Sequence, residues 1–182
     1  MKALLLSLFT LVFFNMAQAQ EFVREKDPKT GKPILRGKMK FSDIQDETVN
    51  AWFYKGASNY EPKDEAIRTL RSVSAPYRLV VFLGTWCEDT QDLLPKFYKM
   101  LNQAGMDLNA VELYGVDRNK ECLNLEHVFY NVKKVPTFIV MHQHREVGRI
   151  TESVNLSIEE DLAAMMEKDF RDLERQRAEK RV

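Results

Sequence analysis

The sequence predicts an α/β domain with a mixed central sheet flanked by helices and with extra helices at its N-terminal side. Three observations carry this prediction. From residue 78 onward, apolar runs alternate with helical patterns, which indicates parallel strands joined by crossover helices. The last two apolar runs are separated only by a short turn, which indicates an antiparallel hairpin. Helical patterns without strands occupy residues 41–74.

Length, composition and charge agree with one ordinary domain. The chain has 182 residues, of which 45% are hydrophobic and 10% aromatic, so it can bury a sizeable core. Basic and acidic side chains number 27 each. Because nucleic-acid binding usually needs a basic excess, we expect no nucleic-acid partner. The balanced charge also gives no reason to expect an anionic membrane surface as partner.

Residues 1–19 have the pattern of a signal peptide. Lys2 gives a positive start, an apolar run follows over residues 3–14, and Ala-Gln-Ala at residues 17–19 is a small-x-small cleavage signal. The apolar run is shorter than the ~20 residues that a membrane-spanning helix needs. We therefore expect an exported protein, periplasmic or secreted, that begins near Gln20 and has no membrane span after cleavage. An uncleaved N-terminal anchor is the alternative.

The N-terminal part of the mature chain divides into a leader and two helices. Residues 20–40 are polar and contain two prolines and two glycines, which predicts an extended or flexible leader. Ser42 is a plausible N-cap for the first helix. The apolar positions at helical spacing in this helix are Ile44, Val49, Trp52 and Phe53. Gly56 and Pro62 interrupt the pattern, and the second helix carries Ala66, Ile67 and Leu70 on one side.

The sheet begins with residues 78–83, where five apolar side chains follow one another without alternation. Such a run suits a strand that is buried on both faces, as in parallel sheets. The remaining predicted elements are a helix over 90–104, a strand over 110–116, a helix over 121–130, strands over 135–140 and 146–151, and a helix over 157–173. Residues 175–182 are highly charged and are expected to form a fraying tail.

Cys87 occupies a special position, directly after the first buried strand and at the start of the next helix. Ligands and chemistry in open α/β sheets collect at this edge. The helix N-terminus directs backbone donors and a positive dipole end at the sulfur, which favours the reactive thiolate. The neighbouring carboxylates of Glu88 and Asp89 oppose this effect. Both outcomes stay open.

The residues around Cys87 resemble those of the thioredoxin family. The segments that carry the resemblance are residues 80–87 (Val-Val-Phe-Leu-Gly-Thr-Trp-Cys), the strand end Val116-Asp117, and residues 135–138 (Val-Pro-Thr-Phe). The resemblance covers roughly residues 77–170. It implies a thioredoxin-like fold over residues 41–174, in which the helices at 41–74 look like those added to exported bacterial thioredoxin-like proteins.

The resemblance also assigns roles to residues on both sides of Cys87. It implies that the Val135–Pro136 peptide is cis and faces the cysteine. It implies further that Trp86, Val135 and Pro136 shape a groove for an extended substrate backbone, with hydrogen bonds of the kind that an added β-strand makes.

The chain departs from the family at the second cysteine of the Cys-x-x-Cys motif, where it has Thr90. Release of a mixed disulfide by a second cysteine of the motif is therefore excluded. A monothiol reductase or isomerase route through Cys87 remains, with protein disulfides or low-molecular-weight thiols as partners and without cofactor or metal. For Thr90 two roles stay open: donation of a hydrogen bond to the thiolate, or a backbone contact in the first helical turn.

Cys122 is the candidate for a displaced resolving thiol, because its predicted position lies at the same sheet edge as Cys87. A disulfide needs Cα atoms within about 7 Å, and the starts of two separate helices suggest a longer gap. A buried, inert Cys122 is the alternative. Two further functions therefore stay open: an oxidoreductase that uses Cys87 with Cys122, and a non-catalytic binding module that uses the same groove.

Overall fold

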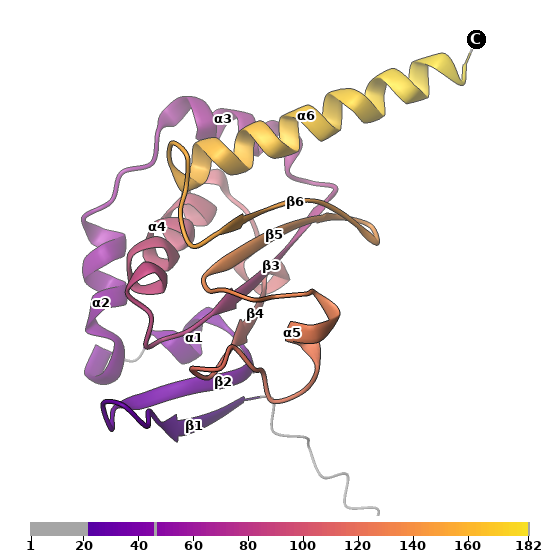
Figure 1. Cartoon of the computed structure of the whole chain (residues 1–182). Coiled ribbons are helices and arrows are strands. Elements are labelled where there is room, and N and C mark those ends of the chain that lie inside the picture. The colour runs from indigo at the N-terminus through magenta and orange to yellow at the C-terminus, as the bar shows by residue number, and fades with distance from the viewer. Residues whose placement is uncertain (1–21, 46, 182) are drawn as a thin grey trace, which may run out of the picture.

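Six strands form one mixed sheet in the order β1-β2-β4-β3-β5-β6 (Figure 1). A computed structural model describes residues 22–45 and 47–181, so the predicted signal peptide lies outside the described residues. The strands are β1 (Phe22–Lys26), β2 (Pro33–Met39), β3 (Tyr77–Leu83), β4 (Glu112–Gly115), β5 (Thr137–His142) and β6 (Arg145–Thr151). The predicted α/β fold with a mixed sheet is confirmed.

The helices are α1 (Phe41–Ile44), α2 (Glu47–Ser58), α3 (Asp64–Val73), α4 (Glu88–Ala104), α5 (Glu126–Phe129) and α6 (Ile158–Glu179), with a short 3₁₀ turn at Leu108–Ala110. From β3 onward the order is therefore strand, helix, strand, helix, strand, strand, helix, as the sequence predicts. β3 and β4 are parallel, whereas β5 is antiparallel to both β3 and β6.

Alternate residues of β3 face two separate cores, which explains its unbroken apolar run. Leu79, Val81 and Leu83 face a larger core that is covered by α1 to α4 and α6. Val80 and Phe82 face a smaller core on the other side of the sheet, closed by loop residues around α5. Burial on both faces removes the reason for a polar residue at any of these positions.

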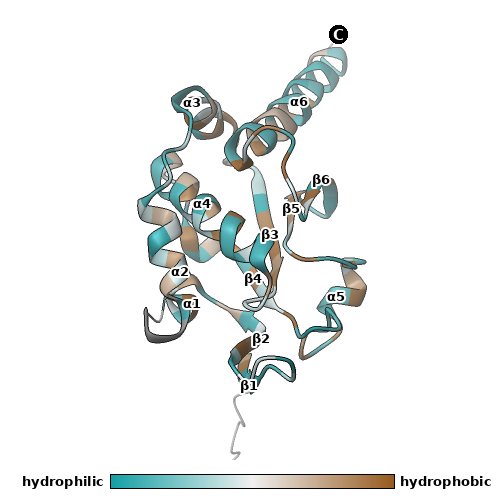
Figure 2. Cartoon of the chain, turned by 60° about the vertical axis from the view of Figure 1, so that its left-hand side comes forward, coloured by the Kyte–Doolittle hydropathy of each residue, from teal (hydrophilic) through white to brown (hydrophobic). Residues whose placement is uncertain are grey.

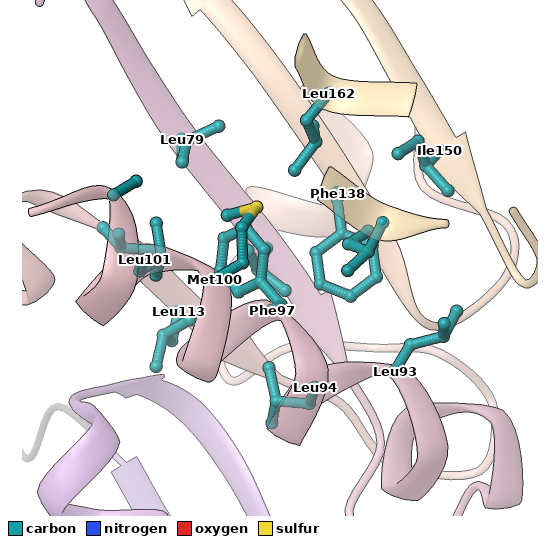
Figure 3. Close-up of a cluster of buried hydrophobic side chains, with 14 of the residues drawn as sticks. Leu79, Leu93, Leu94, Phe97, Met100, Leu101, Leu113, Phe138, Ile150 and Leu162 are labelled. Carbon is teal, nitrogen blue, oxygen red and sulfur yellow. The ribbon is translucent and has the colours of Figure 1, made fainter. Parts of the chain in front are cut away.

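The larger core centres on two aromatic rings (Figure 3). Phe97 of α4 and Phe138 of β5 have ring centroids 4.9 Å apart. Leucine and methionine side chains from the neighbouring elements surround them, namely Leu79, Leu94, Met100, Leu101, Leu113 and Leu162. This packing fixes α4 against the sheet and thereby fixes the N-terminal end of α4.

The prediction of a flexible leader over residues 20–40 is wrong for residues 22–39, which form the β1–β2 hairpin. Its turn is closed by backbone hydrogen bonds between Asp27 and Lys32 and between Asp27 and Gly31, where Gly31 has a positive φ of 70°. β2 pairs antiparallel with β4 and continues the sheet. The hairpin contributes buried Ile34, Leu35 and Met39 to the protein interior.

Three helical predictions also need correction. The first helix is split into α1 and α2, and Ser42 is the second residue of α1, which begins after Lys40, rather than an N-cap. The helix predicted over 121–130 is reduced to α5, because only a short stretch after Leu125 has helical geometry. The tail after residue 174 does not fray: α6 continues to Glu179.

The C-terminal end of α6 is exposed. Leu162 and Met166 are fully buried, whereas residues 174–181 are exposed. Figure 1 shows this part of α6 projecting beyond the sheet, and Figure 2 shows that it is mainly hydrophilic. Ion pairs one helical turn apart, such as Arg177 with Glu174, stabilise it locally.

Candidate functional site

Cys87 is the N-cap residue of α4 and is partly buried. Its backbone N–H donates to the carbonyl of Gly84 at 2.9 Å, which closes the turn between β3 and α4. Its thiol donates to the carbonyl of Val135, with Sγ 3.3 Å from the oxygen. The sulfur thus lies between the first turn of α4 and the segment that leads into β5.

The Val135–Pro136 peptide bond is cis, and both residues are buried. Two contacts hold this segment in place: the Pro136 carbonyl accepts from the N–H of Glu152 at 2.8 Å, and the Thr137 hydroxyl donates to the carbonyl of Lys134 at 2.8 Å. The structure therefore brings Val135 and Pro136 to Cys87.

Trp86 lies at the carboxyl ends of β3 and β4. Its indole N–H donates to the carbonyl of Val116 at 3.0 Å. The ring also passes directly over Gly84, where an added Cβ would lie 2.7 Å from a ring carbon, so this close approach requires glycine. The guanidinium of Arg118 lies over the Trp86 ring, 4.9 Å from the ring centroid.

Arg118 is fixed by a carboxylate from the N-terminal hairpin. Its Nε and Nη2 donate to the two oxygens of Asp27, at 2.6 and 2.7 Å. The Asp27 side chain is only 1% exposed and also accepts from the Thr30 hydroxyl at 2.6 Å. The charged hydrogen bond from Arg118 is the main cause that holds the pKa of Asp27 well below its usual range.

Arg118 also interacts electrostatically with Cys87. The hydrogen bond to Asp27 raises the pKa of Arg118, and the negative charge of Cys87 as a thiolate contributes in the same direction. Sequence reasoning missed both residues. The signal for Asp27 was present as an Asp-Pro-Lys-Thr-Gly turn pattern, but nothing in the sequence pairs this turn with Arg118.

Thr90 is fully buried, and its hydroxyl oxygen accepts a hydrogen bond from the N–H of Gly84 at 3.3 Å. Of the two roles considered for Thr90, the structure thus shows the backbone contact. This bond joins the first turn of α4 to the turn that carries Trp86 and Cys87. Gln91 adds a second link, since its side-chain amide donates to the carbonyl of Thr85 at 2.8 Å.

Cys122 is a free thiol that is 2% exposed. It lies in the loop before α5 rather than at a helix start, and it belongs to the smaller core against which Cys87 packs. Burial, followed by the charge of the nearby Glu126 carboxylate, raises the pKa of Cys122 to about 12. Cys122 is therefore protonated at neutral pH, and it is not bonded to Cys87.

A cavity of about 770 Å³ lies beside Trp86 on the side of the hairpin. Its walls come from the β1–β2 hairpin, from α2, from the start of α4 and from Arg118. The residues that line it include Lys32, Pro33, Ile34, Trp52, Trp86 and Arg118. The lining includes Trp86 and Glu88, the two sequence neighbours of Cys87, but not Cys87 itself.

The described residues include neither a cluster suited to a metal ion nor a helix suited to span a membrane. No three His, Cys, Asp or Glu side chains in residues 22–45 and 47–181 lie close enough together to hold a metal ion. Over the same part of the chain, no helix combines the length and the apolar character that crossing a membrane requires.

Comparison with known proteins gives one family match. A family model described as thioredoxin matches residues 40–163, more than half of the chain. The search of curated proteins finds no match.

Similar solved structures include an HIV epitope-scaffold and a protein of unknown function from Pseudomonas aeruginosa. The scaffold is 20% identical with a TM-score of 0.44, over 63% of this chain and 72% of that one. The Pseudomonas aeruginosa protein is 20% identical with a TM-score of 0.45, over 72% of this chain and 83% of that one.

Proposed function

Because this chain belongs to the thioredoxin family, we propose that it is a thiol–disulfide redox protein that acts through one cysteine, Cys87. The observation that carries this proposal is the position of the Cys87 sulfur. It lies at the N-terminus of a 17-residue helix, partly exposed, and 3.3 Å from the carbonyl of Val135. A helix N-terminus favours the thiolate, which is the attacking form in disulfide exchange.

The proposed reaction has two steps. The Cys87 thiolate attacks one sulfur of a substrate disulfide, so that a Cys87–substrate disulfide forms while the substrate S–S bond breaks and its second sulfur leaves as a thiolate. A second thiolate then attacks the substrate sulfur of this mixed disulfide and releases the Cys87 thiolate. This second thiolate belongs either to a low-molecular-weight thiol, which becomes disulfide-bonded, or to the substrate, which is then isomerised.

Thr90 supports the monothiol form of this scheme, because no thiol stands at the second position of the motif. Cys122 is a poor substitute, since it is 2% exposed and its pKa is raised to about 12. A protonated and buried thiol attacks a mixed disulfide slowly. The oxidoreductase that uses both cysteines is therefore the less favoured alternative.

Reaction of the purified protein with an activated disulfide tests the proposal. In a mixed disulfide assay with reduced glutathione as the external thiol, we expect multiple turnovers by the wild type and by Cys122→Ala. We expect none by Cys87→Ser. Without glutathione, the wild type should stop after one equivalent, with the mixed disulfide on Cys87. Failure of Cys87 to form a mixed disulfide would overturn the proposal.

We also propose that the protein works in the cell envelope or outside the cell. The support is the signal-peptide pattern of residues 1–19. N-terminal sequencing of the protein from its native host tests this directly. We expect a mature chain that starts near Gln20, and an intact Met1 in a cytoplasmic fraction would contradict the proposal.

A further inference from the structure

The β1–β2 hairpin lies outside the segment that the family model matches, yet it contacts the turn that precedes Cys87. The match begins at residue 40, whereas the hairpin ends at Met39. β2 pairs with β4 only from Gly37 to Met39, so the preceding part of β2 extends past the end of β4. There the N–H of Leu35 donates to the Thr85 hydroxyl at 3.3 Å, in the turn before Cys87.

Arg118 presents a donor that the hairpin does not use. Asp27 occupies Nε and Nη2, and no described residue accepts a hydrogen bond from Nη1. The side chain is 23% exposed and lines the cavity beside Trp86. Because Asp27 holds two of the three nitrogens, the direction of the remaining N–H bonds is fixed before any ligand binds.

We propose that the cavity between the hairpin and α2 binds the polypeptide segment that flanks the substrate disulfide, with Nη1 of Arg118 donating to a backbone carbonyl of that segment. This assignment rests on the proposed disulfide exchange at Cys87. It makes Arg118 a specificity-determining residue and Asp27 a positioning residue.

The walls of the cavity favour a polypeptide over a small thiol. Trp52 and Trp86 offer aromatic surface, and Pro33 adds aliphatic surface from the hairpin. Pockets of about 300–1,000 Å³ hold ligands of drug size, so 770 Å³ accommodates more than one side chain. A low-molecular-weight thiol that reaches Cys87 would leave most of this surface uncovered.

The charges favour a neutral carbonyl as the acceptor. The carboxylate of Asp27 pairs with Arg118, and the cavity lining has two acidic residues, Asp27 and Glu88, and two basic residues, Lys32 and Arg118, so that its formal charge is zero. Lys120, with Nζ 5.8 Å from the Trp86 ring centroid, is not part of this lining. A site without excess charge selects through hydrogen bonds and apolar contacts rather than through long-range attraction.

Two probes with the same leaving group test this assignment. One is the 2-thiopyridyl disulfide of a short neutral peptide with a central cysteine and aromatic neighbours. The other is the 2-thiopyridyl disulfide of N-acetylcysteine amide. Attack by Cys87 releases 2-thiopyridone from both, so the ratio of the two rate constants measures the advantage of the peptide independently of the reactivity of the thiol.

We expect the wild type to prefer the peptide, and Arg118→Gln and Asp27→Asn to lose about fivefold to tenfold of that preference, the effect of one hydrogen bond. Arg118→Lys should not restore it, because a lysine cannot bond Asp27 twice and keep the same direction. The matched control is Arg149→Gln, since Arg149 makes the same two-bond pair with Glu146 on β6, away from the cavity.

Several results would overturn the assignment. Equal rates for both probes in the wild type, or an unchanged preference in Arg118→Gln, would contradict it while leaving exchange at Cys87 intact. Reaction of Cys87 with neither probe would overturn the proposed function as well. Thermal unfolding of each variant, measured in parallel, identifies any variant that does not fold.

Discussion

Cys122 illustrates how burial decides the chemistry of a thiol. Its side chain is 2% exposed, and burial together with Glu126 raises its pKa to about 12. We therefore expect Ellman's reagent at neutral pH to modify one cysteine in the native protein and two after unfolding in urea. Cys87→Ser should abolish the native signal, whereas Cys122→Ala should keep it. Rapid labelling of both cysteines in the native wild type would contradict this expectation.

Thr90 offers a second test at a single position. A thiol three residues after Cys87, in the first turn of α4, stands where the family has its resolving cysteine. We expect Thr90→Cys to release the mixed disulfide on Cys87 without an external thiol, because an internal thiolate then attacks it. Insulin reduction with a dithiol donor measures the gain. Thr90→Ser is the control, since it keeps the hydroxyl that accepts from Gly84. Equal turnover by the two variants would count against a resolving role for this position.

At this scale, the sequence predicts residues that belong to local motifs. The Trp86-Cys87 pair and the Val135-Pro136 pair meet in the structure because each follows or precedes a buried strand of the same sheet. Asp27 and Arg118 are 91 positions apart. Asp27 belongs to a turn pattern and Arg118 to no motif, and only the docking of the hairpin brings them together, so no local pattern could predict their pairing.

The contact between β2 and β4 depends on a glycine. A Cβ at Gly115 would overlap the backbone carbonyl of Leu35, which belongs to β2. We expect Gly115→Ala to reduce the free energy of unfolding by about 1–3 kcal/mol, because a strand backbone cannot yield as a side chain can. Urea denaturation followed by circular dichroism measures the change.

Gly148 in β6 provides the matched control. A Cβ at Gly148 would meet the sulfur and methyl ends of Met165, which are flexible. Gly148→Ala should therefore reduce the free energy of unfolding much less than Gly115→Ala. Alanine also has less conformational freedom than glycine in the unfolded chain, which favours the folded state of the variant. An equal loss of stability in the two variants would show that close contact of β2 with β4 is not the cause.

Elements were predicted well where burial has a clear period and poorly where it does not. β3 and α4 have buried apolar runs or stripes, and both were predicted within a few residues. The hairpin was missed because β1 is an edge strand with a polar composition, typical of edge strands. The helix predicted over 121–130 is too long, and the structure leaves its apolar residues Leu125, Val128 and Phe129 73, 60 and 82% exposed, so no burial stabilises a longer helix there.

The ion pair between Asp27 and Arg118 couples the stability of the whole molecule to pH. The pKa of Asp27 is lowered in the folded protein, so its contribution is present above the pKa of the unfolded state, about 4, and is lost as the pH falls below that value. We therefore compare the urea midpoints of the wild type and of Asp27→Asn at about pH 5 and about pH 3, on either side of that pKa. The midpoint of the wild type should fall more between these two values than the midpoint of Asp27→Asn. Parallel curves for the two proteins would argue that Asp27 has no such role.

The whole-molecule architecture was largely predictable from residue 78 onward, because alternating strands and helices leave few topologies. The order of the elements and the parallel and antiparallel pairings agree with the prediction. The sheet is nevertheless wider than predicted by two strands, since β1 and β2 add to its far edge. The cavity between the hairpin and α2 could not be predicted, because one of its walls comes from those two strands.

The bond between Asp27 and Arg118 also has an evolutionary consequence. One partner lies outside residues 40–163 and the other inside them, so the pair joins the hairpin to the segment that the family model matches. Loss of Arg118 leaves the Asp27 carboxylate buried without its charged partner, and loss of Asp27 leaves the Arg118 guanidinium without its anchor. We expect selection to act against chains that have only one of the two residues. Among related chains, we expect aspartate and arginine at these positions to appear and disappear together, and to mark the lineages that carry the hairpin.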